Sequence, residues 1–253
     1  MFKDSHAHIY LKDFDEDLDE LLISAAAVGV SEIYMPNIDS STISDLHRVE
    51  EAYSSCKAMM GLHPCYVKEN YKSELEIVEK WLGERSYSAI GEVGVDLYWD
   101  KTYVEQQLDA FQKQIAMANN AGLAVIIHSR DSLDITIAEI EKAQKGGLRG
   151  IFHCFNGTVE QGKRIIDAGF YLGIGGVVTF KNAGVDKVAA QLPLSSMVLE
   201  TDAPYLSPVP YRGKRNEPSY VPLIADKVAD IMHVSVEEVG KMTSANCEKI
   251  FSY

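Results

Sequence analysis

Short runs rich in β-branched and other apolar residues alternate with longer amphipathic stretches along the whole chain. We predict strands at residues 2–8, 32–36, 58–63, 88–93, 124–128, 150–154, 170–174 and 197–201. Helical patterns lie between and after these runs, at residues 15–27, 43–53, 74–82, 103–120, 133–145, 159–168, 185–190, 222–232 and 236–251. Strands that alternate with helices in this way form a parallel sheet.

A parallel sheet of this kind is either an open doubly wound sheet or a closed (β/α)₈ TIM barrel. The dinucleotide-binding form of the open sheet needs a Gly-x-Gly-x-x-Gly turn after an early strand, but the first strand here ends in His6-Ala7-His8. Eight predicted strands in 253 residues match the usual size of the barrel. The sequence has no low-complexity linker and no exact repeat, so we predict one barrel domain over residues 1–253.

Charge and cysteine content limit the classes of function. The formal net charge is −13, which disfavours a protein that coats duplex DNA through a basic face. It leaves a nuclease open, because bound metal ions reverse the local sign of a site. The four cysteines form no Cys-x-x-Cys pair, so we expect free thiols. The polar N-terminus and the lack of a long apolar run predict a cytoplasmic protein without a membrane span.

Polar residues that bind metals fall at the predicted strand ends. They are His6, His8, His63, Glu92, His128, His153 and Asp202. Five of the seven histidines belong to this set. Barrel enzymes build their active sites at the carboxyl ends of their strands, so these side chains should converge on one mouth. A single histidine at a strand end is more often structural, and we interpret His47 and His233, which lie in helical patterns, in that way.

The set as a whole predicts a metal site. The side chains of His6 and His8 point to the same side of an extended strand because its period is two residues. Imidazoles and carboxylates together suit divalent cations such as Zn²⁺, Mn²⁺, Mg²⁺ or Ni²⁺. Six of these residues are candidate ligands: His6, His8, Glu92, His128, His153 and Asp202. Six ligands are too many for one tetrahedral ion, so we predict two cations, with Glu92 as the bridging carboxylate.

Several ordered motifs cover essentially the whole chain. They are Asp4-Ser5-His6-Ala7-His8, Gly61-Leu62-His63-Pro64, Gly91-Glu92-Val93-Gly94-Val95-Asp96, Ile127-His128-Ser129-Arg130-Asp131, Phe152-His153-Cys154-Phe155-Asn156-Gly157, Glu200-Thr201-Asp202-Ala203-Pro204-Tyr205-Leu206 and Arg212-Gly213-Lys214-Arg215-Asn216-Glu217-Pro218. Together they resemble the TatD family of metal-dependent deoxyribonucleases. The resemblance implies an amidohydrolase-type barrel, divalent metals and hydrolysis of DNA phosphodiesters, often from the 3′ end. By position, it implies His6, His8, Glu92, His128, His153 and Asp202 as the metal ligands. Many members of the family carry a histidine where this chain has Cys65.

Three further residues are candidates for catalysis. Asp202 is a metal ligand with a second oxygen that can accept the proton of the attacking water. His63 contacts a phosphate or orients the water in one interpretation, and is a structural residue beside Pro64 in the other. Glu200 lies two residues before Asp202. It either accepts a hydrogen bond that orients one of the metal ligands or is a carboxylate at the mouth of the barrel without such a role.

Substrate contacts are predicted in two loops. Arg212, Lys214 and Arg215 form the one dense basic cluster, after the last strand, and we expect it to hold DNA phosphates. Tyr98 and Trp99 can stack an unpaired base. The substrate expected on these grounds is single-stranded DNA or a frayed 3′ end. Two alternatives remain: a hydrolase of small amides, lactones or acyl esters, and a non-catalytic barrel that a metal stabilises as an interaction module.

Overall fold

Eight parallel strands form a closed barrel in the computed structural model, which describes residues 1–145 and 147–252. The strands are β1 (Phe2–Asp4), β2 (Val30–Pro36), β3 (Cys56–Met59), β4 (Ala89–Asp96), β5 (Ala124–Arg130), β6 (Gly150–Phe152), β7 (Phe170–Ile174) and β8 (Met197–Leu199). Continuous ladders join β1 to β3 and β4 to β8. A bridge between Met60 and Ile90 and a hydrogen bond from Ser5 N to Leu199 O (3.0 Å) close the two seams. The predicted (β/α)₈ fold is confirmed.

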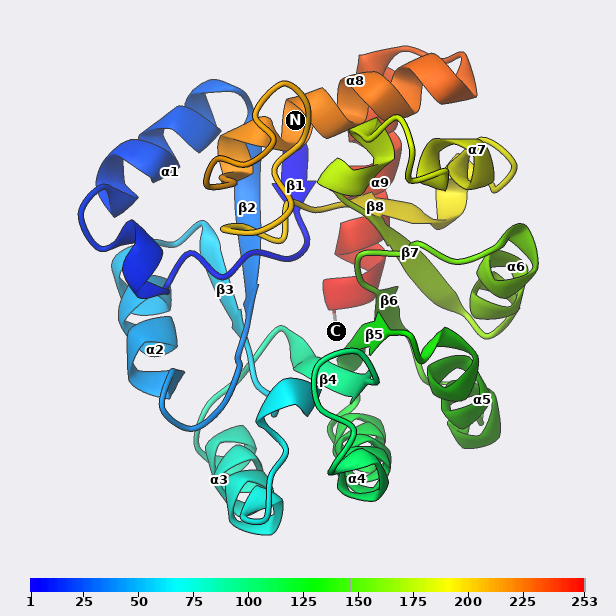
Figure 1. The fold of residues 1–253 in the computed structure, drawn as a ribbon. Coiled ribbons are helices and arrows are strands. Elements are labelled where there is room, and N and C mark those ends of the chain that lie inside the picture. Colours follow the sequence, from blue (N-terminus) through cyan, green and yellow to red (C-terminus); the bar gives the residue numbers. More distant parts are fainter. Residues whose placement is uncertain (146, 253) are drawn as a thin grey trace.

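Helices surround the barrel, and the last one covers one end of it (Figure 1). The helices are α1 (Leu18–Ala27), α2 (Ile43–Ala52), α3 (Tyr71–Glu84), α4 (Val104–Ala121), α5 (Leu133–Ala143), α6 (Val159–Asp167), α7 (Val185–Ala189), α8 (Val221–Met232) and α9 (Val236–Phe251). The start of α6 is fixed by a reciprocal capping box, in which the side chains of Thr158 and Gln161 each accept a hydrogen bond from the other residue's backbone N–H. None of the helices in the described part of the chain has both the length and the apolar character needed to cross a membrane.

The interior of the barrel is sealed at the end where the strands begin. Cys247 and Ile250 of α9 belong to a buried cluster with Met59, Ile126 and Val198 from the strands. A larger apolar core lies between the outer faces of the strands and the surrounding helices. Because α9 fills the amino end, side chains can form an open pocket only at the carboxyl ends of the strands.

Several predicted strands extend too far at their carboxyl ends. The first regular strand ends at Asp4 rather than at residue 8, although Ala7 N still donates to Tyr34 O and His8 N to Ala203 O. Strand β3 ends at Met59, before the predicted end at residue 63. The chain here leaves the ladder to enter the mouth of the barrel. Two residues just beyond strands, Cys154 (φ 47°) and Asp202 (φ 59°), adopt left-handed backbone conformations that are incompatible with a continuing strand.

Candidate metal centre

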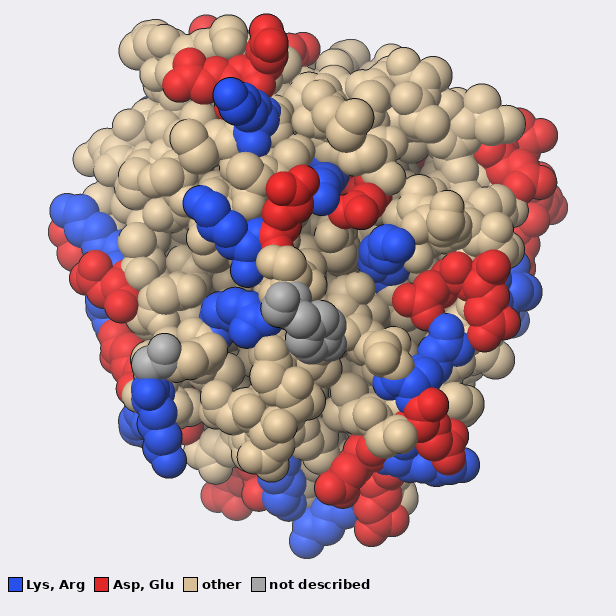
Figure 2. Space-filling view, turned by 180° about the vertical axis from the view of Figure 1, so that it is seen from behind, with Lys and Arg blue, Asp and Glu red and all other residues tan. Residues whose placement is uncertain are grey.

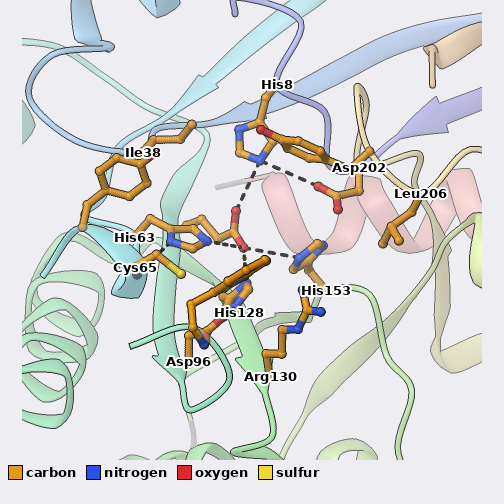
Figure 3. Close-up of a pocket in the computed structure, with 14 residues that line it drawn as sticks. His8, Ile38, His63, Cys65, Asp96, His128, Arg130, His153, Asp202 and Leu206 are labelled. Atoms are coloured by element: carbon orange, nitrogen blue, oxygen red, sulfur yellow. Dashed lines mark hydrogen bonds and ion pairs between the residues drawn. The ribbon is translucent and has the colours of Figure 1, made fainter. Parts of the chain in front are cut away.

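A cavity of about 580 Å³ opens at the carboxyl ends of the strands. It is lined by His8, Ile38, His63, Cys65, Tyr66, Glu92, Asp96, Trp99, His128, Arg130, His153, Asp202, Tyr205 and Leu206. Figure 3 shows His8, His63, His128, His153 and Asp202 pointing toward one centre. His6 is fully buried against the same group of side chains. The structure therefore brings together all six predicted ligands, together with His63.

Glu92 lies at the centre of this group and turns a different oxygen to each half of it. Its Oε2 lies 3.1 Å from His6 Nε2 and 3.3 Å from His8 Nε2. Its Oε1 lies 2.9 Å from His128 Nδ1 and 3.3 Å from His153 Nε2. A cation bound in either half of the group would have a Glu92 oxygen as one of its ligands.

Asp202 faces the first half of the group. Its Oδ1 lies 3.7 Å from His6 Nε2 and 3.8 Å from His8 Nε2. Its backbone N–H donates to His6 O (2.8 Å), which fixes the turn that follows β8 to the segment that follows β1. Burial raises the pKa of the Asp202 carboxyl to about 6, so this group can hold a proton near neutral pH.

The second ring nitrogen of His8 is held so that Nε2 is free to bind a metal. Tyr10 donates its hydroxyl proton to Pro36 O (2.6 Å). The contact between His8 Nδ1 and the Tyr10 hydroxyl (3.1 Å) therefore has Nδ1–H as its donor. In this tautomer the lone pair of His8 is on Nε2, which faces Glu92 and Asp202.

His128 and His153 are oriented by carboxylates behind them. His128 donates Nε2–H to Asp96 Oδ2 (2.9 Å), which leaves Nδ1 for the centre. His153 donates Nδ1–H to Glu200 Oε1 (3.2 Å), which leaves Nε2 for the centre. Such outer partners set the tautomer and orientation of metal-binding imidazoles. Glu200 itself is fully buried and does not line the cavity.

His63 carries its proton on Nε2, as His128 does, but it turns that nitrogen toward the centre. Its Nδ1 accepts a hydrogen bond from the backbone N–H of Cys65 (3.1 Å). Burial lowers the pKa of His63, so the ring is neutral and its proton is on Nε2. That N–H points to Glu92 Oε1 at 3.4 Å. His63 thus presents a hydrogen-bond donor to the cavity, whereas His8 presents an acceptor.

The charges of the centre are strongly coupled. Burial by itself would raise the pKa of Glu92, but His6, His63 and His153 outweigh it and hold that pKa well below its usual range. Burial likewise disfavours a charge on His153, but Glu92, Glu200 and Asp202 raise its pKa to about 10. Without a cation, the site therefore keeps a proton on His153 at neutral pH.

These residues fit divalent metals. The ligand atoms within each of three groups lie within 4.8 Å of one another: His6, His8 and Glu92; His6, His153 and Asp202; and Glu92, His128 and His153. Nitrogen and carboxylate donors of this kind suit Zn²⁺, Mn²⁺ or Ni²⁺. The buried Nδ1 of His6 has no hydrogen-bond partner among the described residues, so it does not fix the tautomer of that ring.

The predicted basic cluster lies outside this cavity. Arg215 forms a two-pronged ion pair with Asp17, with Nη1 and Oδ1 2.8 Å apart. Arg212 stacks on Phe180 (4.0 Å from the ring centroid) and lines a separate cavity of about 470 Å³ with Lys181. Lys214 lies near the ring of Tyr211. None of the three basic residues lines the cavity that contains Glu92.

Several cavity residues had no predicted role, and Asp96 and Arg130 are the charged ones among them. These two residues occupy partner positions on the β4–β5 ladder, and both lie within motifs already recognised in the sequence. Tyr98 and Trp99 are exposed by 52% and 68%, as a base-stacking role requires. The guanidinium of Arg130 lies over the Tyr98 ring.

The remaining histidines and the cysteines lie outside the ligand set. His47 lies in α2, and its Nε2 contacts the Tyr87 hydroxyl (2.8 Å). His233 is the residue at which α8 ends. All four cysteines are free; Cys56 and Cys247 are buried, whereas Cys65 and Cys154 are partly buried. The expectation of free thiols is confirmed.

Comparison with known proteins identifies the family to which this arrangement belongs. The family of TatD-related DNases matches residues 3–252. The chain belongs to this family. The resemblance predicted from the motifs is thereby confirmed, and so is the metal-dependent hydrolase class of which the family is part.

Individual relatives cover the chain from end to end. It is 37% identical over 252 residues to YabD of Bacillus subtilis, described as an uncharacterized metal-dependent hydrolase, and the match spans 99% of each chain. The crystal structure of the TatD homologue YjjV from Escherichia coli superposes with a TM-score of 0.94 at 27% identity, over 100% of this chain and 98% of that one. A TatD-family hydrolase from Entamoeba histolytica shares the fold, with a TM-score of 0.85 at 23% identity over 99% and 98% of the two chains.

Proposed function

We propose that this protein is a binuclear metal-dependent 3′–5′ exodeoxyribonuclease. The observation that carries the proposal is the position of Glu92, with one carboxylate oxygen facing His6 and His8 and the other facing His128 and His153. Two cations held there would lower the pKa of a bound water and polarise the scissile phosphate. The family to which the chain belongs is described as a family of DNases, which supports DNA as the substrate.

The residues of the chain supply the proton transfers and the orientation. Asp202 accepts the proton of the attacking water through its carboxylate. His63 donates its Nε2–H to an oxygen of the scissile phosphate. Glu200 and Asp96 hold His153 and His128 in place and do not contact the substrate.

The shape and charge of the protein favour the end of a single strand. The cavity is enclosed by Tyr66, Trp99 and Tyr205, a lining suited to an unpaired nucleotide. The formal net charge is −13, which disfavours a duplex held by a broad basic surface. The side of the molecule turned away from the viewer in Figure 1 carries acidic and basic side chains mixed together (Figure 2). A duplex lying on the surface would need many phosphate contacts, whereas a strand end needs few. Arg212 and Lys214, in the loop after β8, would contact the phosphates of the strand outside the cavity.

The proposal is tested by digestion of end-labelled DNA with purified, metal-loaded protein. A 5′-labelled single strand should shorten stepwise into a ladder, a 3′ label should be released as mononucleotide, and a closed circular duplex should stay intact. Asp202→Asn serves as the inactive control. Rapid internal cutting of the circle without a ladder would refute the exonuclease. No cleavage of any DNA, with turnover of a lactone, amide or acyl ester, would refute DNA as the substrate.

A further inference from the structure

Among the described residues that line the cavity, Arg130 is the only lysine or arginine. It is the last residue of β5, two residues after His128, so the two side chains leave the strand on the same side. Two residues of strand rise by about 6.6 Å, which places Arg130 one layer farther out than the metal-binding imidazole. Figure 3 shows its side chain extending toward the group formed by His128 and His153.

The guanidinium of Arg130 has no hydrogen-bond partner among the described residues. It lies 4.0 Å from the ring centroid of Tyr98 and 5.5 Å from that of Trp99. Within residues 1–145 and 147–252, no carboxylate forms an ion pair with it. A guanidinium stacked by its face on an aromatic ring keeps its edge donors free for an anion. An unpaired guanidinium that lines a cavity indicates an anionic ligand.

Asp96 fixes this group relative to the metal centre. Its Oδ2 accepts from His128 Nε2–H, and its Oδ1 accepts from the backbone N–H groups of Tyr98 and Trp99, each at 2.9 Å. The backbone carbonyl of Arg130 accepts from Leu97 N–H (2.9 Å). The Asp96 carboxylate thus joins the loop that carries Tyr98 and Trp99 to the predicted metal ligand His128. Strand β5, which ends with Arg130, is hydrogen-bonded to the same loop.

We propose that Arg130 and Trp99 form a nucleotide subsite next to the metal centre. The guanidinium binds the backbone phosphate adjacent to the scissile one, and the indole stacks on the base between them. Asp96 is a positioning residue that keeps this subsite in register with His128. The inference rests on the proposed DNA hydrolysis and adds to it the side chains that select a polynucleotide over a small ester.

The test replaces one phosphate of a single-stranded oligonucleotide by an uncharged methylphosphonate. With wild-type protein, the replacement next to the scissile phosphate should raise KM about 10–100-fold, the usual contribution of a hydrogen bond to a charged group. Arg130→Ala should raise KM for the unmodified strand by a similar factor while kcat changes little. On the methylphosphonate strand the two proteins should have the same KM, because the interaction is already lost. Arg130→Lys should recover part of the affinity, since it keeps the charge without the fork.

Controls separate this inference from the proposed function. Arg48→Ala removes an exposed arginine of α2 and should leave KM unchanged. A methylphosphonate placed far from the cleavage point should cost the wild-type protein and Arg130→Ala equally. If the wild-type protein cleaves DNA but the adjacent methylphosphonate raises KM equally in both proteins, the subsite is wrong and the exonuclease stands. If the wild-type protein cleaves no DNA, the proposed function fails first, which the same assay reveals.

Discussion

His153 Nδ1 lies 3.2 Å from Oε1 of Glu200, on the side of the ring that faces away from Glu92. The same oxygen accepts the backbone N–H of Cys154 (2.5 Å). A Cβ atom at Gly173 would come within 2.3 Å of the Glu200 carboxylate, so the glycine leaves the space that this carboxylate occupies. Glu200 is thus a buried hydrogen-bond acceptor that orients the imidazole of His153 toward the candidate metal centre.

Replacing Glu200 by glutamine tests that role. The amide keeps the shape but weakens the hold on His153, so we expect the affinity for Mn²⁺ to fall by about 10–100-fold with the fold intact. Titration calorimetry measures the affinity, and circular dichroism checks the fold. Glu139→Gln, which removes a carboxylate from α5 outside the cavity, is the matched control. An unchanged affinity in Glu200→Gln would show that Glu200 does not orient the ligand.

Asp202→Asn separates catalysis from folding. Asparagine tolerates the left-handed backbone at this position (φ 59°), so the barrel should keep its melting temperature within a few degrees. Loss of the proton acceptor should lower kcat by about 10²–10⁴-fold. Because Asp202 also faces the predicted cation, rates must be compared at equal metal occupancy. Normal turnover under that condition would assign the general base to another group.

The raised pKa of His153 predicts that metal binding releases a proton. Binding requires a neutral imidazole, while the metal-free site keeps His153 protonated up to a pKa of about 10. The apparent affinity for Mn²⁺ should therefore rise with pH, about tenfold per pH unit for each proton released. Calorimetry in buffers that differ in ionisation enthalpy counts the protons. An affinity that does not change from about pH 6 to about pH 8 would contradict the assignment.

The basic loop after β8 predicts different effects for two of its arginines. The double variant Arg212→Ala and Arg215→Ala should raise KM for DNA more than it lowers kcat. Most of this effect should come from Arg212, because Arg215 is paired with Asp17. Arg215→Ala alone should cost about 1 kcal/mol or less of stability. Steady-state kinetics of the two single variants measure how much each arginine contributes to KM. A large rise in KM for Arg215→Ala would contradict the assignment of the effect to Arg212.

Sequence patterns sufficed for the barrel and for the identity of the central side chains. Period-two spacing places His6 and His8 on one side, and the strand-end positions of Glu92, His128 and Asp202 lead to one mouth. These features are local or follow from the regular geometry of the fold. The strand ends were less accurate, because side-chain contacts in the mouth replace the ladder hydrogen bonds there.

Pairings between distant residues could not be read in the same way. Arg215 and Asp17 are 198 positions apart, and their pairing depends on how two loops meet in space. The role of Asp96 depends on which of its oxygens faces His128 and which faces the next loop. Arg130 was visible within a motif, but that its guanidinium is unpaired is a property of the folded cavity.

In the proposed function, Glu92 would be the ligand shared by two cations. Native mass spectrometry of protein saturated with Mn²⁺ or Zn²⁺ tests it directly, because the mass of each intact chain counts its bound ions. The wild-type protein should carry two ions, and Glu92→Ala should lose at least one, with its fold verified by circular dichroism. A wild-type protein that saturates at one ion, or a Glu92→Ala variant that still binds two, would contradict the account.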